Sequence, residues 1–382
     1  MNDAAVPAFH VIRTDDALRW FASMIRKEKM LAVDLEADSM FHYQEKVCLI
    51  QMAGKDITAV ADPLAVPDLS PLAPIFADTA VCKIFHGADY DVRSLYRDFS
   101  IEVHNLFDTQ LASMFLGETA TSLEAVVGQR FGVQLDKRYQ KKDWSQRPLP
   151  DEMIAYAASD VVYLVPLAQM LMTELEALGR LEWVREECLY LSGVRSVENG
   201  TGLEILRFRG AGRLPRRNLA VLEDLLKYRR SLAMQKDRPL FKVFSNASML
   251  KIATEMIDTP SSMVESGALS SRQVRVYGNV LSEIVRKARS MPESQLPRYP
   301  KKPKPMLSPE VPERVRVIKA WRDDVAADLR LDPALLFNRA LLTAIAIRRP
   351  ADMAALEKID GIRHWQVKTF GKAVLAALHT VA

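Results

Sequence analysis

The chain has 382 residues, of which 49% are hydrophobic and 26% are charged. This length favours two to four domains of roughly 100 to 200 residues each, and the composition excludes a mainly disordered, fibrous or membrane-embedded chain. No run approaches the roughly 18 uninterrupted apolar residues of a membrane span, and residues 1–16 lack the pattern of a secretory signal. We therefore expect a cytoplasmic protein with no membrane partner.

Charge is divided unevenly along the chain, although the net charge is only +4. Residues 1–200 carry 19 Lys and Arg against 30 Asp and Glu, whereas the remaining residues carry 33 against 18. This asymmetry is consistent with a polyanion-binding C-terminal part attached to an acidic domain, or with solvated surfaces of either sign. Composition alone does not decide between these two interpretations.

The three cysteines, Cys48, Cys82 and Cys188, lie far apart and show no metal-ligand spacing. Their neighbours are largely apolar, as in the run Val47 to Ile50. We predict reduced thiols that fill the core, rather than disulfides or zinc ligands.

The first third of the chain predicts a mixed sheet with flanking helices. Alternating or continuous apolar runs predict strands at residues 31–36, 47–53, 57–61, 81–85 and 103–107. The first three follow one another closely enough for antiparallel hairpins. A helix is predicted over residues 89–99, and another begins at Asp108, a good N-cap residue. From Ser122 to about Gly193 the pattern is helical apart from a basic loop at residues 137–150.

The C-terminal part contains an internal repeat. A shift of 93 positions superposes Tyr228-Arg229 on Trp321-Arg322 and Phe244 on Phe337 without any gap. The sequence therefore predicts two copies of one small helical unit. Between them lies a segment with prolines at positions 292, 297, 300, 303, 305, 309 and 312. This density favours a semi-rigid extended linker.

Four acidic residues are candidates for metal-ion chemistry. Asp34 and Glu36 share one face of a predicted strand, because side chains at i and i+2 project together. Asp91 comes shortly after a strand end, and Asp160 stacks one helical turn after Tyr156. Taken singly, each also fits a solvated acidic face or a capping aspartate beside a core tyrosine.

The combination favours the chemical interpretation. Four carboxylates are the hard oxygen ligands that a pair of Mg²⁺ or Mn²⁺ ions requires. Two such ions about 4 Å apart can activate a water and stabilise both the attacking and the leaving oxygen of a phosphoryl displacement. Neither a His-Cys metal spacing, nor a GxSxG elbow, nor a GxxxxGK[ST] loop offers a competing site.

These segments resemble the motifs of a known enzyme superfamily. Three segments of the chain resemble, in order, the first, second and third motifs of the tyrosine subclass of DEDD exonucleases. They are VDLEAD (33–38), HGADYDVRSL (86–95) and YAASDVVYL (156–164). Further segments resemble the bacterial ribonuclease D family in particular. They are LFDTQLAS (106–113), LDKRYQKKDWSQRPL (135–149) and the two C-terminal repeats. Each repeat is similar to the helicase-and-RNase-D C-terminal (HRDC) domain. The resemblance runs over nearly the whole chain in family order.

The resemblance implies an α/β, ribonuclease H-like exonuclease domain with a mixed sheet flanked by helices, followed by two all-α HRDC domains. We place the exonuclease domain at residues 1–200, HRDC domain 1 at 201–290, the Pro-rich linker at 291–312 and HRDC domain 2 at 313–382. The implied activity is that of a 3′–5′ exoribonuclease that releases nucleoside 5′-monophosphates. The implied substrates are structured RNAs with a single-stranded 3′ end, such as tRNA precursors. No obligate protein partner is inferred.

Roles carried over from the family fall on five residues. Asp34, Glu36, Asp91 and Asp160 would hold two Mg²⁺ or Mn²⁺ ions, and Tyr156 would orient the attacking water. A tyrosine with a pKa of about 10 suits orientation better than proton removal at neutral pH. His86 opens the second motif and is expected to be a structural or substrate-edge residue rather than a metal ligand.

Basic residues are candidates for RNA contact. Within the loop at 137–150 we predict that Lys137, Lys141 and Arg147 bind the substrate. Trp144 would either stack on bases or anchor the loop to the domain. Ahead of the first repeat, further affinity for RNA is expected from Arg207, Arg209, Arg213, Arg216 and Arg217.

Two alternative functions stay open. A 3′–5′ DNA exonuclease could use the same four carboxylates, because their chemistry does not involve the 2′-hydroxyl. A non-catalytic nucleic-acid-binding scaffold is less favoured, because all four carboxylates and the tyrosine are present.

Overall fold

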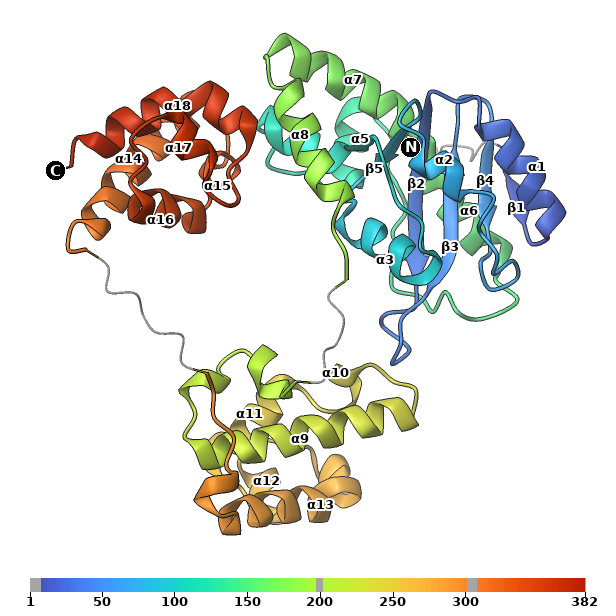
Figure 1. Cartoon of the computed structure of the whole chain (residues 1–382). Helices are drawn as coiled ribbons and strands as arrows, with labels where there is room; N and C mark the ends of the chain where they lie inside the picture. Colours follow the sequence, from blue (N-terminus) through green and yellow to red (C-terminus); the bar gives the residue numbers. More distant parts are fainter. Residues whose placement is uncertain (1–7, 197–201, 301–307, 382) are drawn as a thin grey trace. The chain divides into compact units, whose positions relative to one another are not determined.

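The computed structural model describes residues 8–196, 202–300 and 308–381 (Figure 1). These residues form two compact units. One contains residues 8–37, 46–196 and 308–381, and the other contains residues 38–45 and 202–300. The second helical repeat, residues 308–381, therefore belongs to the same unit as the N-terminal α/β domain, whereas the first repeat, residues 202–300, belongs to the other unit.

The α/β domain is built on one six-stranded mixed sheet in the order β1-β4-β3-β2-β5-β6. Its strands are β1 (His10–Ile12), β2 (Met30–Ala37), β3 (Val47–Ala53), β4 (Thr58–Ala61), β5 (Cys82–Phe85) and β6 (Leu106–Asp108). The strands β2, β3 and β4 form the predicted antiparallel hairpins, and the pairs β1–β4, β2–β5 and β5–β6 are parallel. The predicted mixed sheet is confirmed.

Eight helices surround this sheet (Figure 1). They are α1 (Asp15–Ile25), α2 (Ala73–Ala77), α3 (Asp89–Phe99), α4 (Thr109–Leu116), α5 (Leu123–Phe131), α6 (Asp151–Val162), α7 (Leu164–Ala177) and α8 (Leu181–Ser192). Helix α6 packs on β2, β3 and β4, and α7 packs on α4, β2 and β5. The central β2 strand is therefore in contact with α6 and with α7.

Helix α1 and strand β1 were not predicted from the sequence. The helix begins after Thr14, whose side chain accepts the Ala17 N–H, and it buries Leu18, Phe21 and Ile25 along one face. Strand β1 has only three residues, and its partner β4 lies far along the chain. A parallel edge strand of only three residues is too short to show a recognisable alternation of apolar and polar residues.

Among the residues that the structure describes, helices α6 and α7 together form one apolar stretch that is long enough to cross a membrane. Within Asp151–Ala177, a window of 18 residues has a mean hydropathy of 1.4, and half of that window is buried inside the protein. Their packing on the sheet and on α4 accounts for this apolar character. That the protein has no membrane partner stays a prediction.

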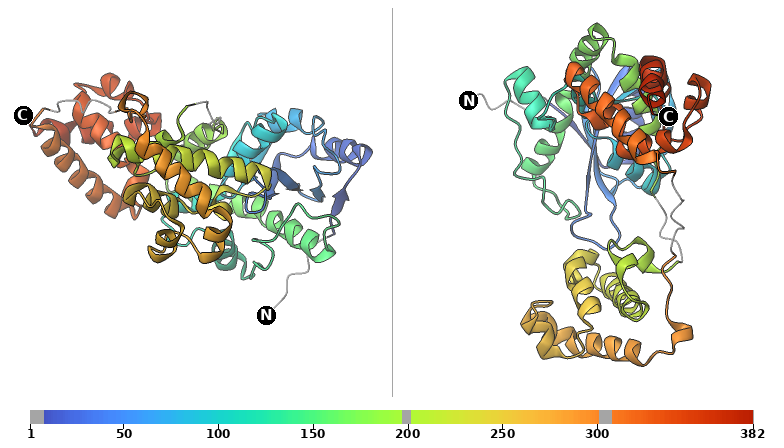
Figure 2. Two further views of the ribbon diagram at one scale, coloured as in Figure 1. Left: turned by 90° about the horizontal axis from the view of Figure 1, so that it is seen from below. Right: turned by 90° about the vertical axis from the view of Figure 1, so that its left-hand side faces the viewer.

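The second repeat consists of five helices. They are α14 (Val311–Leu329), α15 (Pro333–Leu336), α16 (Arg339–Arg348), α17 (Met353–Glu357) and α18 (His364–His379). The repeat packs against α4 and α8 of the α/β domain through Trp365, whose ring lies 4.7 Å from that of Trp183 and 5.7 Å from that of Phe115 (Figures 1 and 2). One continuous hydrophobic core therefore runs through both parts.

Polar contacts fix the start of α18 on α8. The Glu186 carboxylate accepts the backbone N–H groups of His364 at 2.6 Å and Trp365 at 2.8 Å. The Glu187 carboxylate accepts the indole N–H of Trp365 at 3.0 Å and pairs with Arg363 at 3.1 Å. Carboxylates are favoured at a helix N-terminus because its first N–H groups lack partners within the helix.

The first repeat is also helical. Its elements are η1 (Glu204–Arg207), η2 (Ala211–Arg213), α9 (Arg216–Gln235), α10 (Leu240–Val243), α11 (Asn246–Glu255), α12 (Pro260–Glu265), α13 (Ser271–Ser290) and η3 (Glu293–Gln295). Each repeat contains the same internal hydrogen bond at equivalent positions. Arg229 donates to the Phe244 carbonyl at 3.1 Å in the first repeat, and Arg322 donates to the Phe337 carbonyl at 2.7 Å in the second. The predicted internal repeat is confirmed in three dimensions.

The proline-rich segment begins as part of the first repeat. Leu296 is buried in that repeat's core, and Arg216 donates to the carbonyls of Glu293 and Leu296. Arg217 donates to the carbonyl of Met291 at 2.9 Å. Both guanidinium groups therefore hold this segment in place, and their contribution to RNA affinity stays a prediction. Residues 301–307 of the predicted linker lie outside the described residues.

All three cysteines are free, with Cys48 and Cys188 buried and Cys82 partly so. The predicted reduced thiols are confirmed.

Candidate active site

A cleft of about 360 Å³ opens beside β2 and α6. Its lining includes Asp34 and Glu36 from β2 and Tyr156 and Asp160 from α6. The structure thus brings together four of the five residues assigned to catalysis from the sequence.

Strand alternation explains the position of the first pair. Val33 and Leu35 are buried in the hydrophobic core, so Asp34 and Glu36 project from the opposite face of β2. Helix α6 packs against this strand. Tyr156 and Asp160, one turn apart, both reach the cleft from α6.

Asp91 reaches the site from a different element. It lies in the first turn of α3, after the end of β5, and its side chain is buried. The cleft lining does not include it, but the charge of Asp34 helps to raise the pKa of Asp91, after burial itself. The fifth residue therefore interacts with the cleft electrostatically from below its surface.

The carboxylates destabilise one another's charged forms. Burial raises the pKa of Asp34 to about 6 and that of Asp160 to about 8, where the charge of Asp34 adds to the effect. The pKa of Glu36 rises to about 10 through burial and the charges of Asp34, Asp160 and Asp91. Buried like charges of this kind are costly unless protons or cations relieve them.

This donor set suits a divalent cation chemically. All four groups offer the hard oxygen ligands that Mg²⁺ and Mn²⁺ prefer. Within residues 8–196, 202–300 and 308–381, no three His, Cys, Asp or Glu side chains already form a complete metal-binding group. The carboxylates therefore supply the charge and the donors of a metal site without a preformed ligand cage.

Tyr156 is protonated at neutral pH. Burial and the charges of Asp160 and Glu36 raise its pKa far above the usual value. Its ring is flanked by Trp144 at 6.1 Å in a stacked arrangement and by Tyr139 at 5.6 Å in an edge-on arrangement. Trp144 is 1% exposed, so of its two predicted roles the structure shows the anchoring one.

The three basic residues predicted to bind substrate have different surroundings. Lys137 lines the cleft and is ion-paired with Glu124. Lys141 is exposed on the same loop but is not part of the lining. The structure therefore brings only Lys137 to the catalytic carboxylates.

Arg147 is used by the fold instead of the cleft. Its guanidinium donates to both carboxylate oxygens of Asp62 at 2.7 Å and to the Cys48 carbonyl at 2.9 Å. Asp62 is 2% exposed, and a buried carboxylate requires such a cation. Its contacts anchor the loop to β3 and to the turn after β4, and substrate contact by Arg147 stays a prediction.

Two polar residues at the cleft complete the description. His86 lines the cleft with its ring nitrogens 2.9 Å from the Thr109 hydroxyl and the Thr121 carbonyl, and burial lowers its pKa. These hydrogen bonds fit the structural role of the two expected for His86. Asp136 also lines the cleft, and its charge helps to raise the pKa of Asp160. Sequence reasoning missed Asp136, whose only signal was its place next to Lys137.

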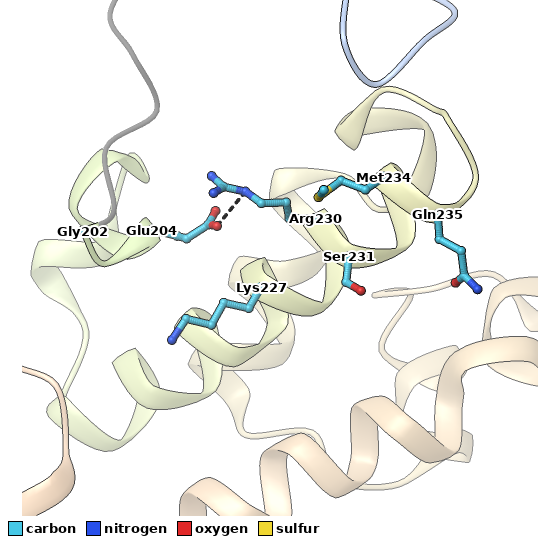
Figure 3. A pocket seen from close by; sticks show the side chains of 7 residues that line it. All are labelled: Gly202, Glu204, Lys227, Arg230, Ser231, Met234 and Gln235. Atoms are coloured by element: carbon cyan, nitrogen blue, oxygen red, sulfur yellow. Dashed lines mark ion pairs between the residues drawn. The ribbon is translucent and has the colours of Figure 1, made fainter.

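A second cavity, of about 680 Å³, lies elsewhere, on η1 and α9 of the first repeat. Arg230 forms an ion pair there with Glu204 (Figure 3), with a distance of 2.8 Å between the charged atoms. Lys227 pairs with Glu223 at 3.2 Å. Both cations are thus neutralised, and the lining contains no cluster of catalytic groups. We therefore place the chemistry in the smaller acidic cleft.

Comparison with known families agrees with this fold. The sequence model of a family described as 3'-5' exonuclease matches residues 9–176, and that of the HRDC domain matches residues 218–285 and 312–378. The class of protein is therefore a 3′–5′ exonuclease that carries two HRDC domains.

Individual relatives narrow the class. Ribonuclease D of Gluconacetobacter diazotrophicus is 31% identical over 98% of this chain and 94% of that protein. Ribonuclease D of Escherichia coli K12 is 31% identical over 87% of this chain and 88% of that protein. The crystal structure of the E. coli enzyme, described as an exoribonuclease involved in structured RNA processing, superposes with a TM-score of 0.72 at 27% identity, covering 98% of this chain and 99% of that one.

The chain belongs to the ribonuclease D family. It is a 3′–5′ exoribonuclease, and its family membership implies an RNA substrate and dependence on divalent metal.

Proposed function

We propose that this exoribonuclease uses two Mg²⁺ or Mn²⁺ ions to remove nucleoside 5′-monophosphates from the single-stranded 3′ ends of structured RNAs such as tRNA precursors. Asp34, Glu36, Asp91 and Asp160 would hold the ions. The observation that carries the proposal is the meeting of three carboxylates, those of Asp34, Glu36 and Asp160, in one cleft beside Tyr156, with the buried Asp91 interacting electrostatically with Asp34. Bound ions would relieve the repulsion among these carboxylates.

Each side chain has a defined task in this proposal. The ions, when bound, supply positive charge that favours ionisation of water and stabilises the phosphate oxygens. The protonated hydroxyl of Tyr156 orients the attacking water, and Trp144 and Tyr139 keep its ring in place. Lys137 at the cleft attracts the phosphate backbone of the incoming strand.

The basic charge of the C-terminal part and the similarity to ribonuclease D of E. coli support a structured RNA as the substrate. The C-terminal part, from residue 201 onward, carries 33 Lys and Arg against 18 Asp and Glu, which favours salt-dependent, sequence-tolerant affinity for RNA. The E. coli relative is described as acting in structured RNA processing. We further propose that the protein acts in the cytoplasm, without an obligate protein partner.

The test is an RNA carrying a 5′ label and a single-stranded 3′ tail, incubated with Mg²⁺, with Mn²⁺ or with chelator. The proposal predicts stepwise shortening from the 3′ end only when metal is present, with nucleoside 5′-monophosphates as products. A matched DNA strand tests the alternative specificity, and Asp34→Asn controls for contaminating nucleases. Metal-independent cleavage, or products that carry a 3′-phosphate, would overturn the proposal.

A further inference from the structure

Asp108 occupies the point where two neighbouring strands end. Strands β5 and β6 are parallel, and Phe85 pairs with Asp108 at their carboxyl ends. Strand β5 continues through residues 86–88 into α3, whose first turn carries Asp91. Strand β6 ends at Asp108, which is the N-cap of α4. The connections from β5 to α3 and from β6 to α4 thus begin at the same edge of the sheet, and Asp108 lies between these two connections.

The carboxylate of Asp108 links the two connections by accepting hydrogen bonds from four backbone N–H groups. One oxygen accepts from Gly87 at 2.9 Å, from Gln110 at 2.8 Å and from Leu111 at 3.1 Å. The other oxygen accepts from Ala88 at 2.8 Å. Asp108 is 3% exposed, so these bonds offset the cost of burying its charge.

Capping α4 alone does not require this arrangement. Asp352, the N-cap of α17, holds its helix with a single bond from Ala355 at 2.8 Å. The bonds from Gly87 and Ala88 to Asp108 are additional, and they fix the turn that leads into α3. Gly87 has a φ of +79°, a left-handed conformation that glycine adopts readily.

We infer that Asp108 is a positioning residue for Asp91. By fixing Gly87 and Ala88 it sets the first turn of α3, and it thereby directs the Asp91 carboxylate toward Asp34. Asp91 depends on this more than the other three carboxylates do, because it alone comes from α3, whereas those three lie on β2 and α6. The inference rests on the proposed role of Asp91 as a metal ligand.

Two substitutions separate this role from capping. In Asp108→Ser the hydroxyl can still cap α4, but it is too short to reach Gly87 and Ala88. In Asp108→Asn one oxygen remains for three of the bonds, while an NH₂ group faces the Ala88 N–H. The matched control is Asp352→Ser, which changes an N-cap without the additional contacts.

The experiment measures Mn²⁺ binding to the full chain by the electron paramagnetic resonance signal of free Mn²⁺. It is combined with hydrogen exchange at Gly87 and Ala88 in the metal-free protein. Groups that orient metal ligands typically contribute 10- to 100-fold in affinity. We therefore expect Asp108→Ser to weaken Mn²⁺ binding by about tenfold or more and to speed exchange at both amides. Asp352→Ser should change neither quantity.

Asp91→Asn separates a failure of the proposed function from a failure of the positioning role of Asp108. If Asp91→Asn binds Mn²⁺ as tightly as the unmodified chain, the proposed function fails. If Asp91→Asn weakens binding while Asp108→Ser binds normally and keeps slow exchange at Gly87, the positioning role is refuted and the proposed function stands. If Asp108→Ser does not fold by circular dichroism, Asp108→Asn is used instead; it loses only the Ala88 bond, so normal Mn²⁺ binding together with slow exchange at Ala88 would refute the positioning role.

Discussion

Neutralising one catalytic carboxylate should make the metal-free protein more stable. Burial raises the pKa of Asp34 from 3.8 to about 6, so the folded state favours its protonated form. The stability linked to this group is present below pH 3.8 and is lost as the pH rises through about 6. The difference corresponds to about 3 kcal/mol, at about 1.4 kcal/mol for each tenfold change in proton affinity. Asp34→Asn removes this loss, together with the repulsion that Asp34 exerts on Glu36 and Asp160.

The assay is urea unfolding with chelator at about pH 4.5, 6 and 8, followed by tryptophan fluorescence. All five tryptophans lie in the unit that holds the cleft, so the signal reports that unit alone. At pH 8 we expect Asp34→Asn to be more stable than the unmodified chain by up to about 3 kcal/mol. The difference should shrink to about 1 kcal/mol at pH 4.5, where Asp34 is mostly protonated in the folded chain but still largely ionised in the unfolded chain.

Added Mn²⁺ should reverse the order at pH 8, because it stabilises only the chain with all four carboxylates. Asp16→Asn, at a side chain that is 97% exposed, should behave like the unmodified chain throughout. A difference between Asp34→Asn and the unmodified chain that does not change with pH would refute the reasoning, as would a less stable variant at pH 8.

Four further substitutions test other parts of the account. Tyr156→Phe should lower kcat by about 100-fold or more without changing Mn²⁺ affinity, as measured by single-turnover kinetics. Trp365→Ala should destabilise the unit by about 3 kcal/mol and expose residues 308–381 to limited proteolysis, since it removes the ring that joins the second repeat to α8. Arg147→Met should destabilise by about 3 kcal/mol because it leaves Asp62 buried without its cation, whereas Lys141→Gln should leave stability unchanged and reduce the salt dependence of RNA binding.

Local patterns in the sequence were sufficient for much of the fold and the cleft. Alternation along β2 predicted that Asp34 and Glu36 share a face, and helical spacing predicted that Tyr156 and Asp160 do so. The 93-residue shift predicted both repeats, and Arg229 and Arg322 make matching hydrogen bonds within them. Each of these signals involves residues close in sequence or a direct internal comparison.

Pairings between distant residues could not be predicted in the same way. Arg147 belongs to a run of basic residues, and its partner Asp62 lies 85 positions away, so nothing local separates it from the solvated Lys141. The packing of the second repeat depends likewise on Glu186, which holds the start of α18 from 178 positions away. Local charge and hydropathy show that a group is charged, but not which distant group neutralises it.

The central claim is that Asp34, Glu36, Asp91 and Asp160 hold divalent cations together. Crystals of the full chain soaked in Mn²⁺ test it directly, through anomalous scattering recorded near the manganese absorption edge. The account predicts two manganese peaks in the cleft beside Tyr156, with oxygen atoms of all four residues as ligands. A cleft without manganese, or manganese bound without these carboxylates, would contradict it.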